Sequence, residues 1–131
     1  MEVNDNRIQK VLSHIRKNIY KTVDIDSLAA ISCLSKDHFI RLFKKEVGTT
    51  PLQYINQKKI EKAQLILITE DIPVKNIAYL LAYEDHSYFN RLFKKITDVT
   101  PQQYRELYKS NRLIIFTQRF TYFFQPLPPY T

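Results

Sequence analysis

The chain of 131 residues contains a single glycine, Gly48. Glycine-rich phosphate-binding motifs need several glycines where the backbone approaches phosphate, so a dinucleotide-binding fingerprint and a P-loop are both excluded. Tight β-hairpins also rely on glycine, which argues against a fold rich in β-strands. The scarcity of glycine therefore favours a helical protein.

Cysteine is equally scarce, and the lone Cys33 allows no internal disulfide, so nothing indicates secretion. The first five residues are polar and lack the apolar run of a signal peptide. The longest apolar stretch, residues 113–124, contains Arg119 and falls short of the roughly 20 residues that a membrane-spanning helix needs. We therefore expect a cytoplasmic protein with no membrane partner.

Positive charge, in contrast, is plentiful. The chain has 20 basic and 13 acidic residues, a formal net charge of +7 and a pI near 9.5. Such an excess on a small domain favours a polyanionic partner, nucleic acid first and an anionic membrane second. A basic protein without such a partner can have the same composition. Charge alone therefore does not decide between a polyanionic partner and none.

The most informative feature is an internal repeat with an offset of 50 residues. Residues 35–45 (SKDHFIRLFKK) recur as residues 85–95 (DHSYFNRLFKK), and residues 50–54 (TPLQY) recur as residues 100–104 (TPQQY). Two copies are too few for a solenoid, so they indicate a duplicated supersecondary unit.

The offset changes upstream of these segments. Leu28 and Ala29 pair with Ile77 and Ala78 at an offset of 49, so the second copy has one extra residue in its turn. Each copy therefore has the pattern of two helices joined by a turn.

Residues suited to helix starts stand at the expected places in both copies. Asp24 and Ser35 are suited to N-cap the two helices of the first copy, and Asp85 the second helix of the second copy. Pro73 fits the first turn of the remaining helix. The second helix of each copy has one apolar face at helical spacing. These faces consist of Phe39, Leu42, Phe43 and Val47, and of Phe89, Leu92, Phe93 and Ile96.

Three further helices complete the predicted all-α fold of about seven helices. An amphipathic helix precedes the first copy, a linker helix of about residues 50–69 includes Leu65 among its apolar residues, and a last helix starts at Pro101. We expect two helix-turn-helix units joined by this linker helix, a duplicated homeodomain-like arrangement. The expected boundaries are 1–110 for the whole domain, about 7–48 for the first unit, about 73–110 for the second, and 111–131 for an apolar tail.

The outward face of the second helix in each copy is polar and basic. Arginine can bond guanine and asparagine can bond adenine in the major groove, and lysine is suited to phosphates. A solvated helix face has a similar composition, but the repetition of Arg-x-x-Lys-Lys at the same place favours DNA. The candidate DNA-binding residues are Lys36, Asp37, Ile40, Arg41, Lys44 and Lys45 in the first copy, and His86, Ser87, Asn90, Arg91, Lys94 and Lys95 in the second.

The length of the linker helix supports this interpretation. About 20 residues span roughly 30 Å at 1.5 Å per residue. Successive major grooves on one side of B-DNA are about 34 Å apart. One chain could therefore place both helices in adjacent major grooves without dimerising.

Residues 89–95 (FNRLFKK), followed by residues 100–105 (TPQQYR), closely resemble the C-terminal signature of the AraC/XylS family of bacterial transcription regulators. The similarity runs from about Arg7 to Lys109. It implies a sequence-specific regulator, usually an activator, that acts at the nucleoid on double-stranded promoter DNA together with RNA polymerase. It also implies that the two base-reading helices are those that start at Ser35 and Asp85.

The chain departs from the family pattern at four places. Cys33 and Ala82 replace glycines in the turns, and Asp98 replaces the glycine after the second recognition helix. Backbone with positive φ at such sites costs a non-glycine residue about 1 kcal/mol, although aspartate tolerates it fairly well. Lys59 replaces the usual arginine of the linker helix, and Asp37 on the reading face either accepts from a cytosine amino group or repels phosphate.

Most family members carry a separate sensor domain. Only about six residues precede the first predicted helix, so we expect either the minimal DNA-binding type or a fragment of a longer regulator. In the first case no small-molecule effector is expected.

Two other classes of function compete with DNA binding. An enzyme is not expected, because His14, His38 and His86 are scattered without metal-ligand spacing, and Cys33 is expected to be a small buried core residue. No catalytic residue, metal ion or cofactor is therefore predicted. A protein-interaction module is the alternative, since the apolar residues 113–124 could pack on the helices, bind polymerase or another subunit, or aggregate.

Overall fold

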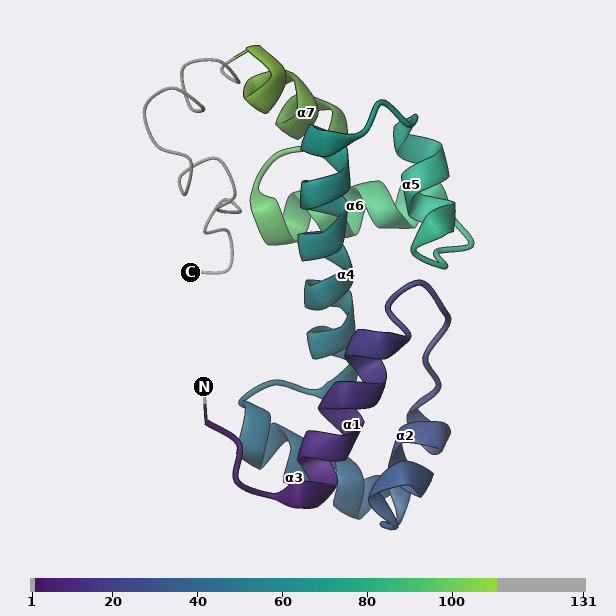
Figure 1. The fold of residues 1–131 in the computed structure, drawn as a ribbon, viewed down its shortest axis with the longest axis vertical. Coiled ribbons are helices and arrows are strands. Elements are labelled where there is room, and N and C mark those ends of the chain that lie inside the picture. Colours follow the sequence, from purple (N-terminus) through teal and green to yellow (C-terminus); the bar gives the residue numbers. More distant parts are fainter. Residues whose placement is uncertain (1, 111–131) are drawn as a thin grey trace. The chain divides into compact units, whose positions relative to one another are not determined.

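The computed structural model describes residues 2–110, which form seven α-helices and no strand (Figure 1). The expected all-α fold is confirmed. The predictions for residues 111–131, including the apolar tail, lie outside the described residues. In chain order the helices are α1 (Asn6–Lys17), α2 (Ile25–Ser32), α3 (Lys36–Val47), α4 (Pro51–Thr69), α5 (Val74–Leu80), α6 (His86–Thr97) and α7 (Pro101–Ser110).

The described residues divide into two compact units, of which the first ends at Lys59 and the second begins at Ile60. Helix α4 runs without a break through this boundary. Each unit therefore has a leading helix, the two helices of a helix-turn-helix, and a closing helix. In the first unit these are α1, α2, α3 and the first part of α4. In the second unit they are the rest of α4, α5, α6 and α7. Helix α2 packs against α1 and α3 in the first unit, and α6 packs against α5 and α7 in the second.

The helix starts agree with the capping pattern, with one exception. Asp24, Ser35 and Asp85 are the N-caps of α2, α3 and α6, and each side chain accepts a hydrogen bond from a backbone N–H of the first turn. Pro73, predicted within the first turn of α5, is instead its N-cap, with ψ at 146°. The carbonyl of Pro73 accepts from the N–H groups of Asn76 and Ile77, so the helix begins one residue later than predicted.

Reciprocal capping boxes begin the two closing helices. The Thr50 N–H donates to Gln53 Oε1 at 3.1 Å, and the Gln53 N–H donates back to Thr50 Oγ1 at 3.3 Å. Thr100 and Gln103 form the same pair at 2.9 and 3.1 Å. The repeated Thr-Pro-x-Gln sequence is therefore a repeated helix start.

The turns adopt the left-handed backbone that the missing glycines predict. Cys33, Ala82 and Asp98 have φ of 59°, 66° and 69°. Cys33 and Ala82 are 49 residues apart, whereas the N-caps that follow them are 50 apart, so the extra residue of the second copy lies in its turn. The prediction that Cys33 is buried is wrong, because the thiol-bearing residue ends α2 at the surface and is exposed.

Replacing Ala82 with glycine should stabilise the chain by about 1 kcal/mol, because the left-handed conformation costs alanine that much more than glycine. The matched control is Gly48→Ala, at φ of 97° with no atom within 4 Å of the added Cβ. This variant should lose a similar amount through backbone strain alone. Urea denaturation of both variants provides the measurement, and an unchanged free energy of unfolding for Ala82→Gly would contradict the assigned strain.

Each unit has its own apolar core, and each core is built around repeated aromatic pairs. The ring centroids of Phe43 and Tyr54 in the first unit are 5.7 Å apart at 73°, and those of Phe93 and Tyr104 in the second are 5.7 Å apart at 78°. No buried residue belongs to both cores within the described chain. Both recognition-helix candidates are therefore anchored in the same way by two fully buried phenylalanines.

One polar side chain lies buried in the leading helix of the second unit. Gln64 is 1% exposed, and neither of its amide atoms has a hydrogen-bond partner within residues 2–110. The leading helices of the two units align at an offset of 52 residues, which pairs Ile8 with Ile60 and Leu12 with Gln64. An unpartnered amide therefore occupies a position that is apolar in the first unit.

Gln64→Leu should stabilise the chain by about 1–3 kcal/mol, because it removes two buried polar atoms that lose their hydrogen bonds to water on folding. Leu12→Gln, the converse change at the matched position, should destabilise it. Thermal and urea unfolding of the two variants test the pair of expectations. Equal or lower stability of Gln64→Leu would show that the buried amide has no energetic cost.

Candidate nucleic-acid interface

The twelve candidate residues occupy six matched positions on α3 and α6. The opposite face of each helix is buried, through Phe39 and Phe43 in α3 and through Phe89 and Phe93 in α6. Nine of the twelve are exposed, and the others, Ile40, His86 and Asn90, are partly buried. Each helix therefore presents a largely exposed face at matched positions, with Ile40 as the apolar exception.

All but one of the arginines and lysines on these faces have no partner within the described chain. The exception is Lys36, whose Nζ lies 3.8 Å from Oδ1 of Asp26. Both side chains are exposed, so this ion pair contributes little to stability. The remaining arginines and lysines of the twelve are exposed and make no hydrogen bond or ion pair with residues 2–110. These unpartnered cations are Arg41, Lys44, Lys45, Arg91, Lys94 and Lys95.

The two helices differ in acidic residues. Helix α6 has none between His86 and Thr97, whereas α3 contains Asp37 and Glu46. Asp37 lies in the first turn of α3, where a carboxylate is favoured by the helix dipole. Glu46 accepts a hydrogen bond from the Asp5 N–H at 3.2 Å. The face of α6 is therefore the more uniformly positive of the two.

Asn90 differs from the other polar candidates. Its Oδ1 is buried and has no hydrogen-bond partner in the described chain, and the matched residue Ile40 packs against the core of the first unit. Bidentate bonding to adenine requires both Oδ1 and Nδ2 of an asparagine. The side chain must therefore rotate before Asn90 can bond adenine in this way.

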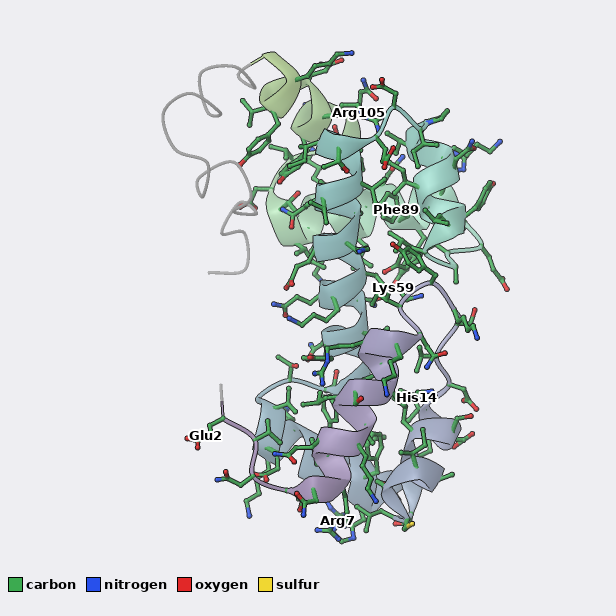
Figure 2. The ribbon with its side chains drawn as sticks, viewed as in Figure 1. Glu2, Arg7, His14, Lys59, Phe89 and Arg105 are labelled. Carbon is green, nitrogen blue, oxygen red and sulfur yellow. The ribbon has the colours of Figure 1, made fainter. Side chains whose placement is uncertain are left out.

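Two cations outside the predicted set contact the backbone (Figure 2). Lys59 Nζ donates to the Lys21 carbonyl at 2.8 Å, and burial lowers the pKa of Lys59 to about 8, so it is mostly protonated at neutral pH. Arg105 donates to the carbonyls of Leu67 and Glu70 at 3.1 and 3.0 Å. Sequence reasoning noted Lys59 only as a departure from the family pattern and missed both contacts.

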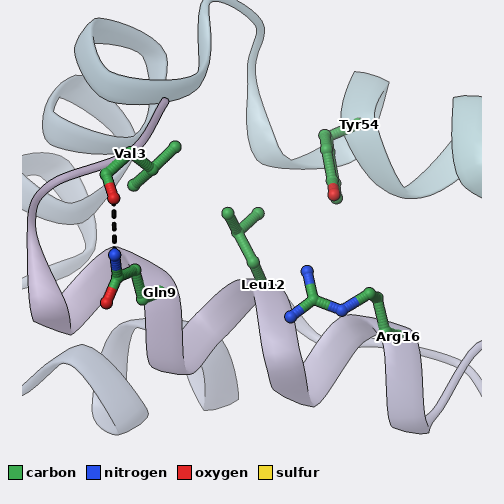
Figure 3. A pocket seen from close by; sticks show the side chains of 5 residues that line it. All are labelled: Val3, Gln9, Leu12, Arg16 and Tyr54. Carbon is green, nitrogen blue, oxygen red and sulfur yellow. Dashed lines mark hydrogen bonds between the residues drawn. The ribbon is translucent and has the colours of Figure 1, made fainter. Parts of the chain in front are cut away.

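A hollow of about 410 Å³ lies in the first unit between the N-terminal segment, α1 and α4 (Figure 3). Its lining consists of Val3, Gln9, Leu12, Arg16 and Tyr54, with the Gln9 amide donating to the Val3 carbonyl. None of these residues belongs to α3 or α6. The hollow is therefore separate from the two matched faces.

Residues 2–110 contain neither a candidate metal site nor a helix that could cross a membrane. No group of three or more histidine, cysteine, aspartate or glutamate side chains there is arranged to bind a metal ion. None of the helices described is both long enough and apolar enough to cross a membrane.

Comparison with known proteins identifies this arrangement. A family model described as a helix-turn-helix domain matches residues 28–107. The MmsAB operon regulatory protein of Pseudomonas aeruginosa is 34% identical over 94 residues, which cover 72% of this chain and 31% of that protein. The chain spans about a third of the length of the curated relatives it matches.

Two solved structures resemble the described fold. The DNA-binding domain of AdpA, solved in complex with a target DNA, superposes with a TM-score of 0.79 at 24% identity, covering 83% of this chain and 98% of that one. The xylose-binding transcription activator XylR superposes with a TM-score of 0.71 at 29% identity, covering 82% of this chain and 28% of that one. Because the matched helix-turn-helix model covers more than half of the sequence, the chain belongs to the AraC/XylS family of DNA-binding transcription regulators rather than to an enzyme family.

Proposed function

We propose that this chain binds promoter DNA sequence-specifically by inserting α3 and α6 into major grooves. The observation that carries the proposal is the set of six exposed, unpartnered cations at matched positions on the two helices. Cations that stay solvated on one helix face are common, but the same three positions recur in both units. DNA-bound AdpA, of similar fold, supports the choice of duplex DNA as the polyanion.

The matched positions suggest a division of roles. Lys44, Lys45, Lys94 and Lys95 lie in the last turns of the two helices and are suited to phosphate oxygens. Arg41 and Arg91 lie mid-helix, where a guanidinium reaches either guanine or phosphate. The cations common to both helices thus provide affinity for DNA. At the other matched positions the two helices carry different residues, which gives the two half-sites different base preferences.

We further propose that the two helices read adjacent major grooves of one duplex. Helix α4, which joins the units, has 19 residues and so a length of roughly 28 Å. Major grooves on one face of B-DNA recur about every 34 Å. The expected binding site is therefore bipartite, with half-sites about one helical turn apart.

The binding claim is tested by titrating a fluorescent duplex with the purified chain at several salt concentrations. The four lysines and the helix N-termini should neutralise about six phosphates, which gives a log–log slope near −5. Heparin at matched charge concentration serves as a competitor that removes non-specific complexes. A slope near zero, or no duplex binding at low salt, would contradict the proposed function.

At the promoter, we propose that the protein acts as an activator that contacts RNA polymerase in the bacterial cytoplasm at the nucleoid. The name of one relative, the transcription activator XylR, supports this direction of control. In vitro transcription with bacterial RNA polymerase tests it on a template that carries the selected site upstream of a weak promoter. More transcript is expected when the protein is added, and less transcript would indicate a repressor.

Base discrimination should lie more in the half-site read by α6, where Ser87, Asn90 and Arg91 are able to hydrogen-bond base edges. Asn90→Ala should relax the preference at one or two base pairs and cost about 1–3 kcal/mol on the best site. Lys94→Ala should instead weaken binding to all sequences alike and reduce the salt slope by about one. Both are measured on matched and scrambled sites, and an equal loss for Asn90→Ala on the two would remove its base-reading role.

A further inference from the structure

Two backbone carbonyls lie four residues before the first helix of the helix-turn-helix in their own units, α2 or α5. Lys21 lies between α1 and α2, and Glu70 lies between α4 and α5. They are 49 residues apart, the same offset that relates Cys33 to Ala82 in the turns. Each carbonyl therefore belongs to the segment that leads into a helix-turn-helix.

In both units a cation from the closing helix donates to this carbonyl. Lys59 Nζ on α4 lies 2.8 Å from the Lys21 oxygen, and Arg105 Nη2 on α7 lies 3.0 Å from the Glu70 oxygen. Arg105 Nε also donates to Leu67, whose carbonyl is in the last turn of α4 where helical acceptors lack partners within the helix. Both bonds thus join the segment before the helix-turn-helix to the helix after it.

These two cations are not copies of one another. At the offset of 50 that relates the closing helices, Lys59 corresponds to Lys109 and Arg105 corresponds to Ile55. In each unit a carbonyl four residues before α2 or α5 is therefore bound by the closing helix, from positions that differ by one helical turn. Duplication of a single ancestral residue would have left the two cations at the same position of the closing helix, and it did not. The feature common to the two units is therefore the hydrogen bond, not the residue that donates it.

The recognition helix lies within the loop of chain that each bond closes. The Lys59–Lys21 bond spans 38 residues and encloses α2 and α3, and the Arg105–Glu70 bond spans 35 residues and encloses α5 and α6. Lys59 is only 4% exposed, so its removal takes away a buried donor and leaves the Lys21 carbonyl without this hydrogen bond. Arg105 provides a planar fork that binds two carbonyls at once.

We propose that Lys59 and Arg105 are positioning residues that orient α3 and α6, respectively, for DNA, an inference that rests on the proposed function. Neither side chain needs to touch DNA for this role. Loss of either bond lets the recognition helix of its own unit shift relative to its closing helix. The effect is therefore confined to one half-site, and the half-site affected differs between the two residues.

The test measures binding of the full chain to three duplexes: the selected site, and the same site with either half scrambled. Lys59→Met should weaken binding to the intact site by about tenfold and lose this defect when the α3 half-site is scrambled. Arg105→Met should show the reverse pattern, losing its defect when the α6 half-site is scrambled. Lys59→Arg should restore the affinity, whereas Arg105→Lys should restore only part of it because one ammonium replaces a fork.

Circular dichroism and melting curves accompany each binding measurement, and Lys59→Gln, which keeps a neutral donor, replaces Lys59→Met if that variant is unfolded. Lys10→Met removes one exposed charge from α1 and should weaken binding to all three duplexes alike. A folded Lys59 variant with unchanged affinity, or with the same defect on both half-scrambled duplexes, would overturn the positioning role. Failure of the unmodified chain to prefer the selected site would instead overturn the proposed function.

Discussion

Truncating Phe93 to alanine should destabilise the second unit by about 3–5 kcal/mol, the range for deleting a buried phenylalanine ring. Phe93 is fully buried, with ring centroids 6.0 Å from Phe89 and 5.7 Å from Tyr104. The same side chain anchors the α6 face that carries Arg91 and Lys94. Chemical denaturation followed by circular dichroism gives the loss of stability, and DNase footprinting gives the loss of contacts.

The matched control is Phe43→Ala, which empties the equivalent position in the first unit. Because no buried residue is shared between the two described cores, each variant should lose protection mainly over its own half-site. A loss below about 1 kcal/mol, or equal loss of both half-sites in both variants, would contradict two separately anchored recognition helices.

Replacing Lys44, Lys45, Lys94 and Lys95 together with alanine should lower duplex affinity by about a thousandfold near 0.1 M salt. Each phosphate contact contributes roughly 0.9 to the magnitude of the salt slope, so the slope should fall in magnitude from near −5 to about −2. The fold should persist, since all four side chains are exposed and alanine favours helix. Fluorescence anisotropy across a salt series provides both the affinity and the slope.

An equal loss of net charge elsewhere on the chain is the necessary comparison. Four other exposed lysines of the described helices lie outside α3 and α6, and their joint replacement by alanine removes the same charge. Binding should then weaken only through the long-range field, with a much smaller change of slope. Equal effects of the two sets would mean that α3 and α6 do not carry the phosphate contacts. The control set is Lys10, Lys17, Lys75 and Lys109.

Local signals predicted most of the fold. N-cap residues, Thr-Pro helix starts and apolar spacing act within a few residues, so the helices are readable without tertiary information. The left-handed turns at Cys33 and Ala82 were predictable because the family resemblance placed these residues where the family carries glycine. The exposure of Cys33 could not be predicted, because it depends on where the turn lies relative to the protein surface.

The burial pattern of α4 could not be predicted from a single periodicity. This helix contributes Tyr54 and Ile55 to one core, but Ile60, Ala63 and Leu67 to the other. No single apolar stripe therefore runs along it. Leu65, expected among its apolar residues, is exposed, whereas Gln64 is buried beside it in the sequence.

The candidate site shows the same division between local and tertiary information. The exposed cations follow from helical spacing, because the phenylalanines that bury the other face determine which side faces solvent. The buried Oδ1 of Asn90 and the carbonyl contacts of Lys59 and Arg105 depend on residues 35 or more positions away, or on packing depth. The two cations differ in residue type and do not align in the repeat, so only their backbone partners relate Lys59 to Arg105.

Selection of bound fragments from a pool of random duplex DNA tests the central claim most directly. The full chain is incubated with the pool at physiological salt, and the retained fragments are amplified and sequenced over several rounds. The expected result is a bipartite motif whose two half-sites lie about one helical turn apart, with more sequence information in the half read by α6. A pool that stays random after repeated selection, or a single undivided motif, would contradict recognition by two matched helices.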